Sequence, residues 1–202
     1  APPGRPFRIL SAGCATGEEA YSIAILAREL LDQGAGRVSI LGVDLNPVAI
    51  TRARVGRYGA WSLRETPEAA RSRWFRPVER EFRVVRELRA MVEFEQGNLV
   101  DPAAPVWRRE PFDAIFCRNV LMYFGGQTQQ TVVARLADAL APEAPLFLGH
   151  AETLRGLSAR YELRQARATF YYTLRTHHST LPWIPSRVAA PTADPALLGD
   201  AD

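Results

Sequence analysis

The chain has 202 residues, enough for one α/β domain with a small appendage, and its 47% hydrophobic and 23% charged residues are ordinary for a globular protein. No apolar run reaches the roughly 20 residues of a membrane span, and APPGRPF at the start lacks the apolar core of a signal peptide. Two cysteines are too few for a disulfide framework, so we expect a cytoplasmic protein. The net charge is +3, and all the basic residues counted in it are arginines; we attribute this to codon usage rather than to nucleic-acid binding.

Strands and helices alternate in the first part of the chain. The predicted elements are a buried strand at 7–12, an amphipathic helix at 17–33, a second strand at 38–44, and a helix at 46–56 with Asn46 as N-cap and Pro47 at its first position. Residues 57–89 then hold nine arginines and five glutamates, and 79–88 could form a hairpin. Alternation returns with strands at 91–99, 112–120 and 144–150, a helix at 127–141 and an antiparallel pair at 160–175.

This alternation predicts a mostly parallel sheet with helices on both faces. Ligands of such sheets bind beyond the carboxyl ends of the strands, so the residues that follow each strand are the candidate site. Residues 1–175 are expected to form this domain, and the Pro-, Ala- and Asp-rich segment 176–202 a flexible tail or linker.

The first strand ends in the turn AGCATGEE. Gly13 and Gly17 allow a ligand to approach the backbone closely, but no lysine follows Gly17, so this is not a phosphate-binding loop. Glu18 and Glu19 would repel a pyrophosphate and would tolerate an ammonium or sulfonium group. The alternative is that both glutamates only complement the positive end of the helix dipole.

The second strand ends in Asp44, where Rossmann-like folds bind ribose hydroxyls with a carboxylate. The alternative is that Asp44 caps the following helix. The glycine turn, the acidic helix start and Asp44 together favour S-adenosylmethionine over NAD or ATP, because this cofactor carries an adenosine and two cationic groups but no phosphate.

A polar pair, Arg118–Asn119, follows the apolar run of the strand predicted at 112–120 and precedes Tyr123. Buried arginines are rare unless they are paired, so Arg118 needs an anion. Either a ligand carboxylate or a protein acid such as Asp113 could supply it. The three histidines and two cysteines have no metal-ligand spacing, and we expect no metal.

The segments SAGCATGEEAYSIAI, FDAIFCRNVLMYF and LFLGHAETL resemble those of the chemotaxis receptor methyltransferases, the S-adenosylmethionine-dependent protein-glutamate O-methyltransferases, and the resemblance spans about residues 7–175. It implies a Rossmann-like class I methyltransferase fold: a mostly parallel sheet with a final antiparallel strand and a small antiparallel β subdomain inserted at 57–90. It also implies methyl transfer to glutamates of a chemoreceptor-like protein, with S-adenosylhomocysteine as product.

The resemblance implies these roles: Ala12, Gly13 and Gly17 shape the floor, Glu18 contacts the methionine end, Asp44 holds the ribose, Asn98 and Leu99 flank the adenine, Arg118 and Asn119 lie along the methionyl side, and Tyr123 points at the transfer site. Arg118 and Tyr123 are the catalytic candidates. Family members also carry an N-terminal helical domain that ends in a Thr-x-Phe-Phe-Arg-like segment; nothing similar precedes Pro6.

The expected partner is the cytoplasmic helical domain of a chemoreceptor, with no nucleic acid and no direct membrane insertion. Arg80, Arg83 and Arg86 could form a cationic docking surface, with Trp61 and Trp74 as apolar anchors; the alternative is a solvated face. Two other functions stay open: a binding module without turnover and a nucleic-acid methyltransferase of the same fold. Against the second, RNVL stands where amino-methylating DNA enzymes carry Asn/Asp-Pro-Pro-aromatic.

Overall fold

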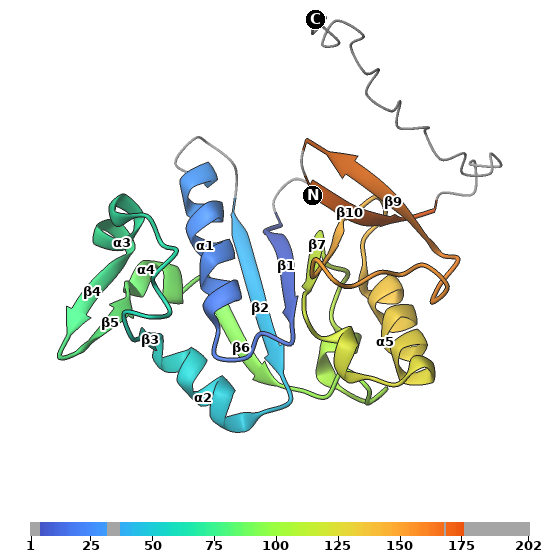
Figure 1. Ribbon diagram of the computed structural model, residues 1–202, viewed down its shortest axis with the longest axis horizontal. Helices are drawn as coiled ribbons and strands as arrows, with labels where there is room; N and C mark the ends of the chain where they lie inside the picture. The colour runs from blue at the N-terminus through green and yellow to red at the C-terminus, as the bar shows by residue number, and fades with distance from the viewer. Residues whose placement is uncertain (1–4, 32–36, 168, 176–202) are drawn as a thin grey trace, which may run out of the picture.

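The structure, a computed structural model, describes residues 5–31, 37–167 and 169–175 (Figure 1). Its seven-stranded sheet has the spatial order β6 (Val92–Gln96), β2 (Val38–Asp44), β1 (Phe7–Ala12), β7 (Ala114–Cys117), β8 (Leu146–Leu148), β10 (Thr169–Leu174) and β9 (Tyr161–Ala166). Neighbours from β6 to β8 pair in parallel, and β10 is antiparallel to both β8 and β9. The expected class I methyltransferase fold is confirmed, including its final antiparallel strand. The predicted tail lies outside the described residues.

Side chains alternate between the two faces of the central strands, and each face carries its own core. Ile9 of β1 lies opposite Ile40 of β2, and its face packs against α1 (Glu18–Leu31) and α2 (Pro47–Val55). Leu10 lies opposite Leu41, and its face packs against α5 (Gly126–Ala139). Because both faces are apolar and covered, the carboxyl ends of the strands remain as the place where loops can form a site.

The segment between α2 and β6, which we call the insert, is a small sheet with two short helices. Its elements are β3 (Arg57–Tyr58), α3 (Glu68–Trp74), β4 (Phe75–Val78), β5 (Glu81–Val84) and α4 (Arg86–Arg89), with the antiparallel order β3-β5-β4. A hairpin is present, but it is formed by β4 and β5 and not by the predicted residues 79–88, whose last part belongs to α4. Neither α3 nor α4 was predicted. Tyr58, Phe75 and Val84 are buried in the same core as α1, and Figure 1 shows the insert beside α1 and α2.

Two further features complete the description of the fold. In its described part, no helix combines the length and the apolar character that crossing a membrane demands. Two 3-10 turns, η1 (Pro105–Arg108) and η2 (Leu121–Tyr123), flank β7. The second of these follows the Arg118–Asn119 loop and carries Tyr123.

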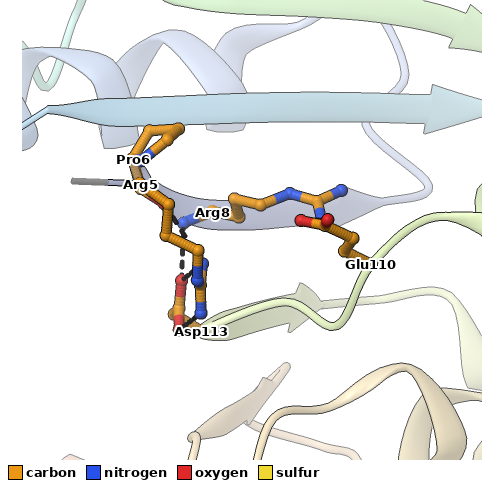
Figure 2. Close-up of polar contacts among 5 residues, drawn as sticks. All are labelled: Arg5, Pro6, Arg8, Glu110 and Asp113. Carbon is orange, nitrogen blue, oxygen red and sulfur yellow. Dashed lines mark hydrogen bonds and ion pairs between the residues drawn. The ribbon is translucent and has the colours of Figure 1, made fainter. Parts of the chain in front are cut away.

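A buried acid anchors the start of β1 to β7. Figure 2 shows the guanidinium of Arg5 facing Asp113, with two hydrogen bonds of 2.7 Å, while the backbone N–H of Arg8 donates to the same carboxylate at 2.9 Å. Asp113 is only 9% exposed. Burial by itself would raise the pKa of this carboxyl, but the hydrogen bonds from Arg5 and from the Arg8 amide hold it below its ordinary value. The anion that Asp113 offers is therefore used by Arg5 and not by Arg118, so the predicted alternative of an Arg118–Asp113 pair is wrong.

Replacing Asp113 with asparagine is expected to lower the free energy of unfolding at pH 7 by about 2 kcal/mol, the range of a charge-assisted hydrogen bond. A carboxyl whose pKa is lower in the folded chain stabilises fully above its unfolded value of about 3.9, and this contribution is lost as the pH falls through the folded pKa. Urea unfolding at several pH values measures the difference between the two chains, which should shrink below about pH 4. Glu110→Gln is the control, because Glu110 pairs with Arg8 at the surface and should change little. An Asp113→Asn effect independent of pH would contradict the assignment.

Candidate cofactor site

The turn between β1 and α1 is pressed against neighbouring elements. Gly13 and Gly17 have φ values of 75° and 92°, the left-handed region that favours glycine. The backbone N–H of Gly13 donates to the carbonyl of Val43 at 2.8 Å. A Cβ on Gly17 would lie 2.9 Å from Cβ of Ala53 and 3.0 Å from the ring of Phe94. The glycines therefore allow the turn to lie directly over α2 and β6.

Asp44 ties this turn to the end of β2. Its Oδ2 accepts the N–H of Ala15 at 2.8 Å, and its Oδ1 accepts the N–H of Asn46 at 2.9 Å. Asn46, not Asp44, caps α2, through its Oδ1 and the N–H of Val48 at 2.9 Å. The helix-cap alternative for Asp44 is wrong, and Asn46 as N-cap is confirmed. A carboxylate oxygen has two acceptor positions, so each oxygen of Asp44 can accept a second donor.

The two glutamates at the start of α1 are in different environments. Glu18 is exposed and accepts the hydroxyl of Thr16 at 2.6 Å. Glu19 is partly buried and accepts the hydroxyl of Ser11 at 2.7 Å. Burial raises the pKa of Glu19, and the Ser11 hydrogen bond and the nearby Arg118 oppose that shift. Glu18 is therefore the glutamate whose side chain faces solvent at the turn, and Glu19 links β1 to the loop after β7.

The Arg118–Asn119 pair lies next to the glycine turn. Arg118 is exposed rather than buried, and its Nη1 lies 3.5 Å from Oε2 of Glu19, which is the acidic partner that the sequence did not identify. Asn119 adopts a φ of 57°. A Cβ on Gly13 would come within 2.4 Å of Cγ2 of Val120, so the loops after β1 and β7 are in direct contact.

The other predicted residues lie around this centre. The exit of β6 adjoins Asp44, because the N–H of Gly97 donates to the Asp44 carbonyl at 2.9 Å. Asn98, next along, is exposed and its Oδ1 accepts the N–H of Val100, while the side chain of Leu99 is 6% exposed and packs in the core. Tyr123 is 80% exposed. Ala12 is buried at the end of β1, directly beneath the turn.

Two functional contacts were missed from the sequence. The hydroxyl of Tyr58, in the insert, donates to the carbonyl of Thr16 at 2.7 Å, so the insert holds the glycine turn. The carboxylate of Glu152, after β8, accepts backbone N–H groups of the loop after β7. The only sequence signal was an acid shortly after a strand, in LGHAE, which does not reveal its partners.

Both thiols are unsuited to nucleophilic chemistry. Burial, reinforced by the charge of Asp44, raises the pKa of Cys14 to about 12, and burial also raises that of Cys117. Both cysteines are free. Across the described residues, no group of three or more His, Cys, Asp or Glu side chains is arranged to hold a metal ion.

These donors and acceptors suit one kind of ligand. Carboxylates of Glu18, Glu19 and Asp44 surround a glycine turn, and Arg118 lies at one end of it. Ribose hydroxyls can donate to Asp44, cationic groups are attracted by the glutamates, and a ligand carboxylate can bind Arg118. A pyrophosphate would meet three carboxylates, so the site fits a nucleoside with positive charge.

Comparison with known proteins agrees with this geometry. Residues 1–170 match the family described as CheR methyltransferase, SAM binding domain. The chain belongs to this family. It is 37% identical over 162 residues to a chemotaxis protein methyltransferase of Salmonella typhimurium, a match that covers 78% of this chain and 56% of the relative. It is 38% identical over 162 residues to a chemotaxis protein methyltransferase of Escherichia coli, and that match covers 78% of this chain and 56% of the relative.

A third relative is chemotaxis protein methyltransferase 2 of Pseudomonas aeruginosa, 38% identical over 171 residues, with 83% of this chain and 60% of the relative covered. The chain thus spans about half the length of the curated relatives that it matches. Membership in the CheR family makes S-adenosylmethionine the cofactor of this domain. The carboxylate-lined glycine turn, with no lysine at the following helix, fits that cofactor.

Proposed function

We propose that this CheR domain transfers the methyl group of S-adenosylmethionine to glutamate side-chain carboxylates of a chemoreceptor-type protein, forming methyl esters in chemotaxis adaptation. The observation that carries the proposal is the junction of Asp44 with the glycine turn on one side and the Arg118–Glu19 pair on the other. The names of the chemotaxis relatives support the class of substrate. We place the reaction in the cytoplasm, on the receptor's helical domain.

In this proposal each part of the cofactor has its own residues. Asp44 accepts the ribose hydroxyls, and Asn98 and Leu99 flank the adenine at the exit of β6. Glu18 contacts the ammonium group, while Arg118 and Asn119 bind along the methionyl carboxylate. Ala12, Gly13 and Gly17 form the floor. Support comes from the adjacency of these loops, which backbone hydrogen bonds link directly at Val43 and Asp44.

The chain's residues need only align and shield the reactants. A glutamate side chain has a reference pKa of about 4.3, so the substrate carboxylate is already a nucleophile at neutral pH and needs no general base. When bound, S-adenosylmethionine supplies an electrophilic methyl group on a positively charged sulfur. Arg118 orients the methionine end, and Tyr123, which is exposed in η2 after the same loop, contacts the incoming carboxylate. Correct alignment and exclusion of water supply the rate enhancement.

The insert is the proposed docking surface for the receptor. Arg80 lies at the tip of the β4–β5 hairpin, Arg83 on β5 and Arg86 at the start of α4. Arg83 stands directly opposite Arg57 and Arg76 across the small sheet, so these three arginines share one face. An acidic helical bundle would complement this row.

The two tryptophans expected as apolar anchors differ in exposure. Trp61 is 77% exposed and its ring stacks under the guanidinium of Arg64, whereas Trp74 is 3% exposed and packs in the core. The prediction that Trp74 anchors a partner is therefore wrong. Trp61 stays available for that role.

Reversing the charge of Arg80 and Arg86, both exposed, is expected to reduce receptor methylation about tenfold while the affinity for S-adenosylhomocysteine stays unchanged. Arg83 is left in place because its Nε is buried. The matched control reverses Arg108 and Arg164, two exposed arginines outside the insert. Equal loss of methylation and of cofactor affinity would refute docking on the insert.

The product distinguishes the proposed function from its rivals. The chain is incubated with radiolabelled S-adenosylmethionine and either the cytoplasmic fragment of a chemoreceptor or nucleic acid. A glutamate methyl ester releases volatile methanol in base, and that release from the receptor is the expected result. An alkali-stable label on RNA or DNA would refute the proposal, and so would cofactor binding without label on any receptor.

A further inference from the structure

One carboxylate organises the loop that carries Arg118 and Asn119. Oε2 of Glu152 accepts the backbone N–H of Asn119 at 2.7 Å and that of Gly149 at 2.8 Å. Its Oε1 accepts the N–H of Val120 at 2.9 Å and that of Leu121 at 2.8 Å. Four backbone amides therefore converge on one side chain, which binds three consecutive residues of the loop.

The loop has little else to define its path. Residues 118–120 lie between β7 and η2 and belong to no helix or strand, and Asn119 is in the left-handed region with a φ of 57°. Backbone amides that leave regular structure need other acceptors, and here Glu152 supplies them. Gly149 permits the arrangement, because a Cβ there would lie 2.8 Å from Oε2 of Glu152 and 3.0 Å from the Asn119 nitrogen.

We propose that Glu152 is a positioning residue for the cofactor. It fixes the backbone of Asn119, next to Arg118, whose guanidinium lies 3.5 Å from Glu19. Glu152 acts through this loop and touches no reacting atom. The inference rests on the proposed function, because it assigns the loop to cofactor binding.

The requirement is for a carboxylate, not only for a side chain of this size. A carboxylate offers acceptors on both oxygens, whereas the amide of glutamine presents one carbonyl oxygen and one NH₂ donor. In Glu152→Gln, one pair of backbone N–H groups would face a donor. Glu152→Asp keeps both oxygens on a shorter side chain, so it should restore part of what glutamine loses.

The test measures the binding of S-adenosylhomocysteine to the 202-residue chain by calorimetry, together with amide hydrogen exchange. Glu152→Gln should weaken binding about tenfold, the cost of leaving amide donors unsatisfied, and Glu152→Asp should weaken it less. Exchange should accelerate at residues 119–121 and remain slow in β1 and β2. Glu110→Gln, an exposed glutamate at the opposite end of β1, is the control and should bind like the wild type.

A double-mutant cycle separates positioning from general stability. If Glu152 acts through Arg118, then Glu152→Gln should cost little further affinity in an Arg118→Ala background, whereas a global loss of stability would reduce affinity by the same factor in both backgrounds. Additive effects, or wild-type affinity in Glu152→Gln, would overturn the inference. If Glu152→Gln does not fold, Gly149→Ala replaces it in the same measurements, because its Cβ would disturb the same carboxylate. The same results would support or overturn the inference. Wild-type chain that fails to bind at all would instead overturn the proposed function, and this inference with it.

Discussion

The affinity for S-adenosylhomocysteine is expected to fall at least about 100-fold when Asp44 is replaced by alanine, because each of the two charge-assisted hydrogen bonds that we propose it makes to the ribose would contribute roughly 1.5–3 kcal/mol. The same change also removes the acceptor of the Ala15 and Asn46 amides, so the glycine turn loses its link to β2. Asp44→Asn keeps the size of the side chain and one acceptor oxygen, and its affinity should lie between those of alanine and the wild type.

Isothermal titration calorimetry measures this effect, with thermal unfolding recorded on the same samples. Asp138→Ala is the matched control, because Asp138 is an exposed aspartate on α5 that pairs with Arg160 and takes no part in the site. Unchanged affinity in a folded Asp44→Ala chain would contradict the ribose assignment. A parallel fall in thermal stability and affinity would show that the turn, rather than the ribose contact, was lost.

Gly13→Ala is expected to produce the second large effect, a loss of both stability and cofactor affinity. Its new Cβ would lie 2.4 Å from Cγ2 of Val120, and its φ of 75° is unfavourable for any side chain. Valine is stiff at χ1, so the β7 loop itself must move away. We expect destabilisation of about 3 kcal/mol, of which roughly 1–2 kcal/mol is backbone strain and the rest the clash.

A second glycine separates strain from clash. Gly156 has a similar φ of 78°, but a Cβ there meets nothing within 4 Å. Gly156→Ala should therefore show the strain alone, about 1–2 kcal/mol in the unfolding free energy, with unchanged cofactor affinity. Equal destabilisation in the two variants, with equal affinity, would show that the contact between Gly13 and Val120 does not matter for the site.

The sequence predicts β1 and β2 well and the insert poorly, for physical reasons. The strand predicted at 112–120 is longer than β7, which spans Ala114–Cys117. The strands at 7–12 and 38–44 match their observed bounds, because each is a short apolar run with a polar exit. The helices α3 and α4 have only seven and four residues, too short for a hydrophobic period to emerge from an arginine-rich segment. Trp74 is buried in a core to which residues of α1, β5 and β6 also contribute, and no local pattern encodes that packing.

The same distinction holds for the candidate site. Asp44 and the glycine turn could be placed because topology alone brings the carboxyl ends of β1 and β2 together. The partner of Arg118 could not be predicted, because Asp113 and Glu19 are both carboxylates in the sequence and only the packing of the folded chain decides which of them Arg118 meets. The role of Glu152 could not be predicted, because its carboxylate accepts backbone N–H groups 31 to 33 residues away. Almost every residue has a backbone N–H, so the side chains in the sequence do not indicate which amides an acid will bind.

The hydrogen bond from Tyr58 to Thr16 gives the insert a second consequence beyond packing. It joins the surface proposed for the receptor to the turn proposed for the cofactor through one buried hydroxyl. When two ligands act on such a shared element, thermodynamic linkage requires that each ligand change the affinity of the protein for the other by the same factor. We therefore expect Tyr58→Phe to weaken communication between receptor and cofactor in both directions by the same factor, even where each still binds on its own.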